Sequence, residues 1–396
     1  MDIQAQPVKE ANRLEWIDAA RGFAIFGIFM VNIGTFSAPY FIYGGEREAW
    51  PSAVDQWTLT VIDIFFQASF YTLFSILFGF GFQLMQERLQ KKGIRVRPFL
   101  TRRLLILIGF GLIHAFLIWH GDILLFYGSI GLLMLLFLKV SGRTLLIWAL
   151  AILLGSAALF TLGLYAARDY IGVAFEAEIQ RAFEKYQSSS LVDIWSQNLR
   201  DWMFSNAGSF LILICMLLPM FLIGMYLAKK RMLHDPKASK PLLVKLWMVM
   251  LVLFLALKAG PYIFGNPTWF SYVQDNIGGV ASALFYIVTF TLAAVTDTGR
   301  RIIRPFGWVG RMALSNYILQ SLVSVLIFYG IGLGLYGEVS PTYTVLMVAG
   351  IFIAQIFLSR WWMARYRFGP LEWIWRSLTY GRKQPFRRME REERKA

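Results

Sequence analysis

Uninterrupted apolar blocks of membrane-spanning length are the feature that most constrains how this chain folds. A helix crosses the hydrocarbon of a bilayer with roughly 20 consecutive apolar residues, and blocks of about that length recur along the sequence. The chain has 396 residues, of which 57% are apolar and only 16% are charged. The sequence therefore predicts an all-α membrane protein, a polytopic bundle of about ten transmembrane helices.

The predicted spans fall into two sets of five, separated by a long polar segment. They cover residues 20–38, 58–85, 103–119, 122–140, 144–167, 208–228, 242–262, 276–295, 311–333 and 342–360. This pattern divides the chain into an amino-terminal membrane half (1–167), an external segment (168–207), a carboxyl-terminal membrane half (208–360) and a basic cytoplasmic tail (361–396). The first block follows a polar start without a clear cleavage site, so we expect a retained helix.

Lysine and arginine gather in alternate loops, which predicts the orientation. Of the 39 basic residues, 33 fall on the side of the amino terminus and five on the other side. Positively charged loops remain in the cytoplasm, so both termini are expected there, with the chain in the inner (plasma) membrane of a bacterium. The net charge of +15 then needs no nucleic acid as partner, because no basic run is interleaved with stacking aromatic residues.

The external segment has helical periodicity of its own. Two stretches place apolar residues on one helical face, namely Phe175, Ile179, Ala182, Phe183 and Tyr186 in the first and Leu191, Ile194, Trp195, Leu199 and Trp202 in the second. Both are typical of amphipathic helices in the outer membrane interface. They would either roof an opening or rest on lipid as a connector.

Ionisable and polar side chains inside predicted spans are candidate functional residues, because the bilayer makes them costly. Asp18 and Arg21 can pair on one face at the inner end of the first span. Asn32 lies three helical turns further, nearly on the same face and about 16 Å outward. An ion pair that fixes the start of the helix is the alternative reading of Asp18 and Arg21.

Two of the three histidines lie beside a carboxylate where the third predicted span meets the fourth. A histidine oriented by an aspartate is a competent general base near neutral pH, so His114, His120 and Asp122 are candidate catalytic residues. His114 and Asp122 can meet only if Gly121 turns the chain back. We expect no metal site here, since a third suitable ligand is missing nearby and Cys215 is the sole cysteine.

Two further groups of polar residues lie within predicted spans. Asp63 is expected either to pair with Lys258 or to contribute to a proton path. Asn316, Gln320 and Ser324 follow one another at intervals of four residues, which places them on one helical face. That stripe would bond to other helices or line a cavity.

At these motifs the sequence resembles the YeiB family of bacterial membrane proteins. The matching segments extend over nearly the whole chain and occur in the family's order. They are Asp18-x-x-Arg21-Gly22-Phe23-Ala24 with Asn32, residues 73–82, Gly111-Leu112-Ile113-His114-Ala115, Gly121-Asp122-Ile123-Leu124, residues 310–317 and residues 368–376.

That family in turn resembles the transmembrane acyltransferase superfamily, which includes heparan glucosaminide acetyltransferase. The resemblance implies transfer of an acyl group from cytoplasmic acyl-CoA to an acceptor at the outer face, with acetyl-CoA as one candidate donor. Asn32 stands where bacterial glycan acyltransferases carry a catalytic histidine, and it cannot act as a base. The expected base is therefore His114 or His120 with Asp122, and the expected donor site is formed by Asp18, Arg21, Asn32, Asn316 and Gln320, with the basic loop 88–103.

A transporter is the alternative function. In that case Asp63 and His114 would line a substrate or proton path and titrate during transport. The expected partners are membrane lipids and an acyl acceptor that the sequence does not identify. A homodimer is compatible with the sequence, although no sequence feature favours it.

Overall fold

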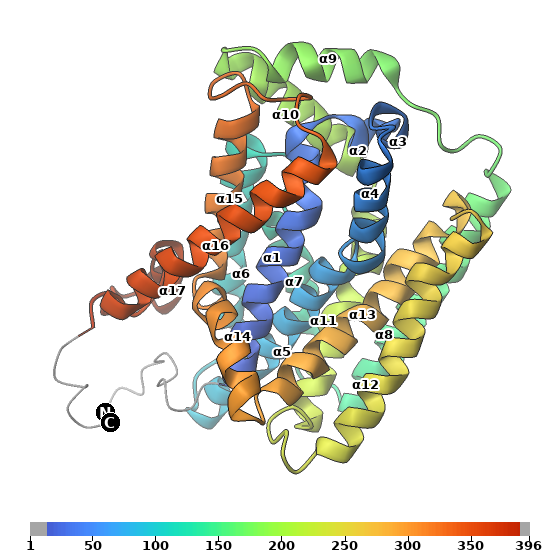
Figure 1. Cartoon of the computed structure of the whole chain (residues 1–396). Coiled ribbons are helices and arrows are strands. Elements are labelled where there is room, and N and C mark those ends of the chain that lie inside the picture. The colour runs from blue at the N-terminus through green and yellow to red at the C-terminus, as the bar shows by residue number, and fades with distance from the viewer. Residues whose placement is uncertain (1–13, 389–396) are drawn as a thin grey trace.

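The computed structural model describes residues 14–388 as a helical bundle, with no β-strand in that range (Figure 1). Lys9, Arg13 and the last basic residues of the tail lie outside the described residues. The long helices are α1 (Glu15–Ser37), α5 (Ser69–Lys91), α6 (Val96–Ile113), α8 (Gly142–Ala166), α11 (Phe210–Lys230), α12 (Lys240–Phe254), α13 (Ser271–Ala293), α15 (Ala313–Phe328) and α16 (Pro341–Arg365).

Shorter helices lie between these. They are α2 (Tyr40–Tyr43), α3 (Glu46–Ala49), α4 (Ala53–Phe65), α7 (Leu124–Leu133), α9 (Glu176–Tyr186), α10 (Leu191–Asn206), α14 (Asp297–Gly310) and α17 (Pro370–Tyr380). Turns of π-helix at His114–Ile118 and Leu255–Ala259 extend α6 and α12, and 3-10 turns occupy Met134–Phe137, Gly260–Phe264 and Thr268–Phe270. The all-α membrane architecture expected from the apolar blocks is confirmed.

Eight helices in the described part of the chain are long and apolar enough to cross a membrane. Helices α14 and α15 pass the same test as a pair but meet at an angle of 72°. The fourth predicted span is a shorter apolar helix, Leu124–Phe137, whose length of roughly 21 Å is less than the bilayer thickness. The count of ten and the orientation remain predictions.

The second predicted span is interrupted, because α4 and α5 are separated by residues 66–68. Ala68 there has φ = 58°, in the left-handed region that non-glycine residues rarely adopt. The break lies against α13, where a Cβ on Gly279 would come within 3.1 Å of the Ala68 carbonyl oxygen. The hydroxyl of Ser282 on α13 also donates to that of Ser69, at 2.7 Å.

Glycines from the family motifs allow helices of the two halves to pack backbone against backbone. A Cβ on Gly22 of α1 would lie 1.9 Å from the Phe306 carbonyl oxygen, and a Cβ on Gly310 of α14 would lie 1.8 Å from that of Asp18. Gly79 of α5 and Gly224 of α11 form a second such crossing, with equivalent distances of 2.0 Å to backbone oxygens of the other helix. Small residues at helix crossings permit this approach in membranes.

The external segment forms α9 and α10, which cover the end of the bundle where α1 ends (Figure 1). Helix α9 buries Ile179, Ala182 and Tyr186, as its periodicity predicts. Helix α10 differs, because its apolar residues Trp195 and Leu199 are exposed. It instead buries Ile194 with the polar residues Gln197, Asn198 and Asp201. The polar face of α10 thus contacts the protein, and its apolar face is free to meet lipid.

Two family motifs that are far apart in the sequence meet at the start of α15. The carboxylate of Glu372 on α17 accepts hydrogen bonds from the backbone N–H groups of Leu314 and Ser315, at 2.7 and 3.1 Å. It also accepts the Ser315 hydroxyl, at 2.5 Å. This carboxylate therefore caps a helix whose own preceding residue, Met312, offers no side-chain cap.

Candidate functional site

The His114 imidazole is fully buried and hydrogen-bonded on both ring nitrogens. Its Nδ1 lies 2.8 Å from a carboxylate oxygen of Asp122, as expected if Gly121 turns the chain back. Its Nε2 lies 2.9 Å from the hydroxyl of Ser321 on α15. One histidine therefore joins a carboxylate from the start of α7 to a serine hydroxyl two hundred residues further along the chain.

The local backbone explains how residues eight apart face each other. His114 begins a turn of π-helix, and Trp119 after it is extended, with φ = −160°. The chain then reverses at Gly121, where a Cβ would lie 2.2 Å from the Trp119 ring. The second oxygen of Asp122 accepts the backbone N–H of Leu125, at 2.6 Å, which fixes the carboxylate at the start of α7.

This arrangement determines the tautomer that catalysis would need. An Nδ1–H that donates to Asp122 leaves the Nε2 lone pair directed at Ser321. The Ser321 hydroxyl can then donate to Nε2, and Asp122 stabilises the imidazolium that forms when His114 takes a proton. The geometry is that of a general base with an orienting carboxylate and a hydroxyl within reach.

A pocket of about 110 Å³ adjoins this cluster and is named the deep pocket here. Its lining includes Asn32, Gln67 and Gly121, together with Tyr317. The Tyr317 ring centroid lies 5.0 Å from that of the His114 imidazole, although His114 itself does not line the pocket. Asn32, the residue in the place of a family histidine, thus lines a pocket that adjoins the His114 cluster through Gly121 and Tyr317.

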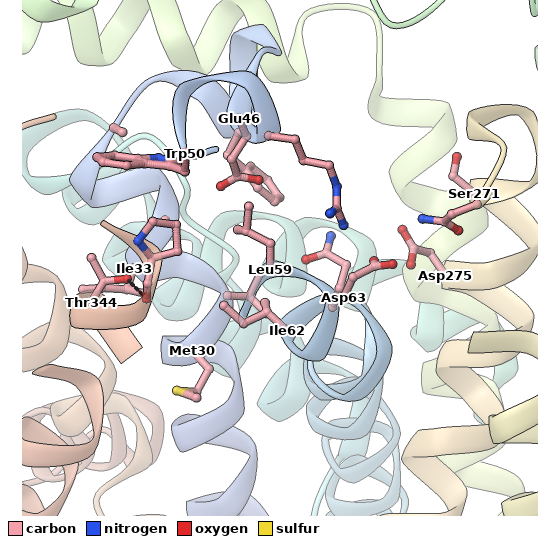
Figure 2. Close-up of a pocket in the computed structure, with 18 of the residues that line it drawn as sticks. Met30, Ile33, Glu46, Trp50, Leu59, Ile62, Asp63, Ser271, Asp275 and Thr344 are labelled. Atoms are coloured by element: carbon pink, nitrogen blue, oxygen red, sulfur yellow. Dashed lines mark hydrogen bonds between the residues drawn. The ribbon is translucent and has the colours of Figure 1, made fainter. Parts of the chain in front are cut away.

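A second and larger cavity, of about 310 Å³, lies at the outer end of the bundle as the charge pattern orients it, and is named the outer cavity (Figure 2). Figure 2 shows Glu46 and Trp50 on one side of it, and Asp63 and Asp275 facing it from α4 and α13. Val31 and Gln67 line both the outer cavity and the deep pocket, so the two spaces are adjacent. The deep pocket is the one of the two that adjoins the His114 cluster, through Gly121 and Tyr317.

A buried lysine pairs with two carboxylates that line the outer cavity, although the lysine itself does not line it. Lys258, with no exposed surface, donates to Asp275 at 2.9 Å and lies 4.0 Å from Asp63. Asp63 in turn accepts the Tyr262 hydroxyl, at 2.6 Å, and the Gln274 amide, at 3.2 Å. The expected pairing of Asp63 with Lys258 is present, although Asp275 is the nearer partner of the lysine.

His120 belongs to a different cluster from His114. Its Nδ1 lies 3.3 Å from the Tyr186 hydroxyl and 3.6 Å from Asp201 of α10. Asp201 also accepts the hydroxyls of Tyr43 and Tyr186, both at 2.6 Å. Burial lowers the pKa of His120 and so favours its neutral form. These bonds attach the external segment to the bundle and place His120 away from Asp122.

The expected donor residues occupy three separate places. Asp18 and Arg21 pair at 3.7 Å at the inner end of α1. The amide of Asn316 donates to Ser359 on α16, at 3.0 Å, and that of Gln320 donates to Gln355 on the same helix, at 2.9 Å. The polar stripe of α15 therefore bonds to α16, and within this set only Asn32 lines one of the two cavities.

Several candidate site residues were not predicted. Ser321 directly follows Gln320 and therefore points to another face of the helix. Its neighbours in the sequence do not distinguish it from other serines. Asp275 could have been found, because a lysine within a span requires a carboxylate partner and Asp275 opens the next span. Asp201 falls in the segment predicted to be interfacial and Glu46 in a loop between two predicted spans, and acidic residues are ordinary in both places.

By these features the chain is a polytopic α-helical membrane protein with polar clusters buried inside its bundle. It belongs to the YeiB family of uncharacterised proteins, as its similarity to the relatives below shows. The family model described as "Protein of unknown function (DUF418)" matches residues 227–382. No solved structure matches the chain.

Curated relatives cover nearly the full length of the chain. The uncharacterised protein YxaH of Bacillus subtilis is 36% identical, over 96% of this chain and 97% of its own. An uncharacterised 39.9 kDa protein of Bacillus acidopullulyticus is 29% identical, over 96% and 97%. The uncharacterised protein YeiB of Escherichia coli is 28% identical, over 92% and 95%. None of these names states an activity.

Proposed function

We propose that this chain is an acyltransferase of the bacterial plasma membrane, which moves an acyl group from cytoplasmic acyl-CoA to an acceptor at the outer face. The observation that carries the proposal is the His114 imidazole held between Asp122 and Ser321. A structural histidine would also need a partner on each buried nitrogen, but a carboxylate on Nδ1 is the partner that makes the imidazole a stronger base. Acyl transfer uses such an imidazole–carboxylate pair as its general base.

The chemical step follows from the position of His114. Its Nε2 takes the proton from a hydroxyl or amine nucleophile, and the nucleophile attacks the thioester carbonyl carbon. The carbon–sulfur bond then breaks, and CoA leaves as the thiol after receiving the proton from the imidazolium. Asp122 acts as a positioning residue, because it holds the imidazole in the required tautomer and stabilises its positive charge.

The inner end of α1 supports a donor site in the cytoplasm. Arg21 lies there beside Asp18, at the side of the bundle that also carries the basic residues of 88–103. Such a concentration of positive charge attracts the phosphates of a nucleotide thioester. The Arg103 guanidinium stacks on the Trp375 ring, 3.6 Å from its centroid, which adds a planar aromatic surface to this region.

Binding of acetyl-CoA to detergent-purified protein, measured by calorimetry, tests the proposal. We expect Arg21→Ala to weaken binding at least tenfold. We expect His114→Ala to bind acetyl-CoA as the wild type does but to release CoA in membrane vesicles at least a hundredfold more slowly, in the range typical of a lost general base.

Matched controls separate these effects from general damage. Arg301→Ala removes an exposed arginine of α14, and His234→Ala removes the histidine outside both clusters. Both control variants should bind acetyl-CoA and release CoA as the wild type does. Failure of acetyl-CoA and longer acyl-CoA to bind at any accessible concentration would overturn the proposal.

A proton-coupled transporter is a second candidate function, favoured by the buried Lys258 and by the two outer-cavity carboxylates with which it pairs. Ionisable groups inside a membrane often mark proton or substrate paths. In proteoliposomes, a transporter would couple solute uptake to a pH change that Lys258→Met abolishes. An acyltransferase would show neither effect.

A further inference from the structure

The outer cavity has the size and lining of a small-molecule site. Its volume of about 310 Å³ falls within the range of ligand pockets. Apolar residues of α1 and α4, the Trp50 indole and a set of carboxylate, amide and hydroxyl groups surround it. It is also adjacent to the deep pocket, because Val31 and Gln67 line both spaces.

The charged groups in and behind this cavity differ in their partners. Lys258 is paired with Asp275 and Asp63. The Arg47 guanidinium donates to Gln56, at 2.9 Å, and to Thr60, at 3.3 Å. The Glu46 carboxylate has no hydrogen bond or ion pair with any residue between 14 and 388, and only the nearby charge of Arg47 favours its ionised form. Three carboxylates and one arginine line the cavity, and Lys258 behind it is the second cation, so negative charge is in excess.

Two hydrogen-bond acceptors at this cavity lack partners within the described residues. In addition to the Glu46 carboxylate, the buried Oδ1 of Asn266 has no partner within the described residues. Asn266 lines the cavity and has a positive φ of 48°, so the fold holds its amide there at a cost in backbone strain. Unsatisfied acceptors call for a ligand that supplies donors, and the Trp50 ring offers a face for a cation.

We propose that the outer cavity binds a small ligand bearing a primary ammonium group, held by the Glu46 carboxylate and the Asn266 amide oxygen beside Trp50. The ligand would be the acceptor of the transfer described above. Its role as acceptor rests on the proposed function, whereas its binding does not. The ammonium group serves as the anchor, while another part of the ligand reaches the deep pocket. The same group could come from a free solute or from an aminolipid headgroup.

Calorimetry with a matched pair of probes tests the inference, without acyl-CoA present. Aminohexanol and hexanediol differ only by the amino group, so their comparison isolates the ammonium. We expect the full-length protein in detergent to bind the amine at least tenfold more tightly than the diol. Glu46→Gln should remove that preference, and Trp50→Leu should weaken amine binding with the carboxylate intact.

Glu48→Gln is the matched control, because Glu48 is an exposed carboxylate on the same short helix and does not line the cavity. It should keep the wild-type preference for the amine. Equal binding of amine and diol, or equal behaviour of Glu46→Gln and Glu48→Gln, would overturn the inference. Because the assay omits acyl-CoA, its failure would leave the proposed acyl transfer untouched.

The source of the ammonium is distinguished in a second arm. The wild type is placed in phosphatidylcholine nanodiscs with or without phosphatidylethanolamine, and amine binding is measured again. Competition by phosphatidylethanolamine would identify a lipid headgroup as ligand, and undiminished binding would identify a free amine. Both outcomes support an ammonium site in the outer cavity.

Discussion

Two buried ionisable residues, His114 and Lys258, lie in turns of π-helix. A π-helical turn inserts an extra residue into the helix and therefore changes the direction in which side chains point. In this chain, one such turn lets His114 reach Asp122, and the other places Lys258 against Asp275. Regular α-helix through either segment would rotate these side chains away from their partners. The irregular backbone and the polar cluster therefore depend on each other.

The raised pKa of Glu46 predicts how the stability of the protein changes with pH. Burial is the main reason that its pKa is raised from 4.5 to about 6. A carboxyl with a raised pKa in the folded state lowers stability as the pH rises through this window, because its charged form is penalised. Glu46→Gln should therefore stabilise the protein at pH 8, by up to about 2 kcal/mol, and have little effect at pH 4.

Thermal unfolding of the detergent-purified variants, measured at both pH values, checks this expectation. Glu48→Gln serves as the control, since its carboxylate is exposed. A stabilisation by Glu46→Gln that was the same at both pH values would contradict the stated cause.

Individual residues also show which parts of the site the sequence can predict. His114 and Asp122 were predictable because they are eight residues apart and only one local turn is needed to join them. Ser321 was not predictable, because its distance from His114 depends on how α15 packs against the end of α6. Lys258 was recognisable as an unusual charge inside a predicted span. Whether Asp63 or Asp275 is its nearer partner depends on distances that only the packed helices define.

At the scale of helices, close glycine crossings determine how the two halves fit together. The crossing of α1 and α14 is the tightest in steric terms, since a Cβ at Gly22 or Gly310 would overlap a backbone oxygen. Backbone atoms cannot move aside as a flexible side chain can. The family motifs that contain these glycines are therefore explained by packing as well as by chemistry.

Gly310→Ala should destabilise the protein by about 1–3 kcal/mol, because the new methyl group forces α1 and α14 apart. Gly155→Ala is the matched control on α8, where nothing lies within 4 Å of the added Cβ. Thermal unfolding in the same detergent measures both. Equal unfolding temperatures for the two variants would show that the crossing tolerates separation.

Helix positions were largely predictable from apolar periodicity, and helix breaks were not. The sequence indicates helices near every predicted span, because burial in lipid demands long apolar runs. The break at Ala68 lies against α13, and the 72° bend between α14 and α15 falls at the start of a predicted span. The reversed face of α10 was also unpredictable, since Asp201 turns inward only because Tyr43 and Tyr186 donate to it.

For the whole molecule, the charge distribution predicts that α9 and α10 lie outside the cell. Cysteine labelling tests this orientation once Cys215, the sole cysteine, is replaced by serine. Glu184→Cys on α9 should react with a membrane-impermeant maleimide in intact spheroplasts. Lys92→Cys, which is exposed at the opposite end, should react only after permeabilisation. The reverse pattern would invert the orientation and, with it, the sides assigned to donor and acceptor.

The deep pocket and the outer cavity differ in size, at about 110 and 310 Å³. Gly121 and Tyr317, the lining residues nearest the His114 cluster, line only the smaller of the two spaces. Under the proposed acyl transfer, the end of an acceptor that reaches the deep pocket would therefore be small, while its larger part would stay in the outer cavity. Acceptors that differ at the deep end would then be separated by size, and differences at the outer end would be tolerated more readily.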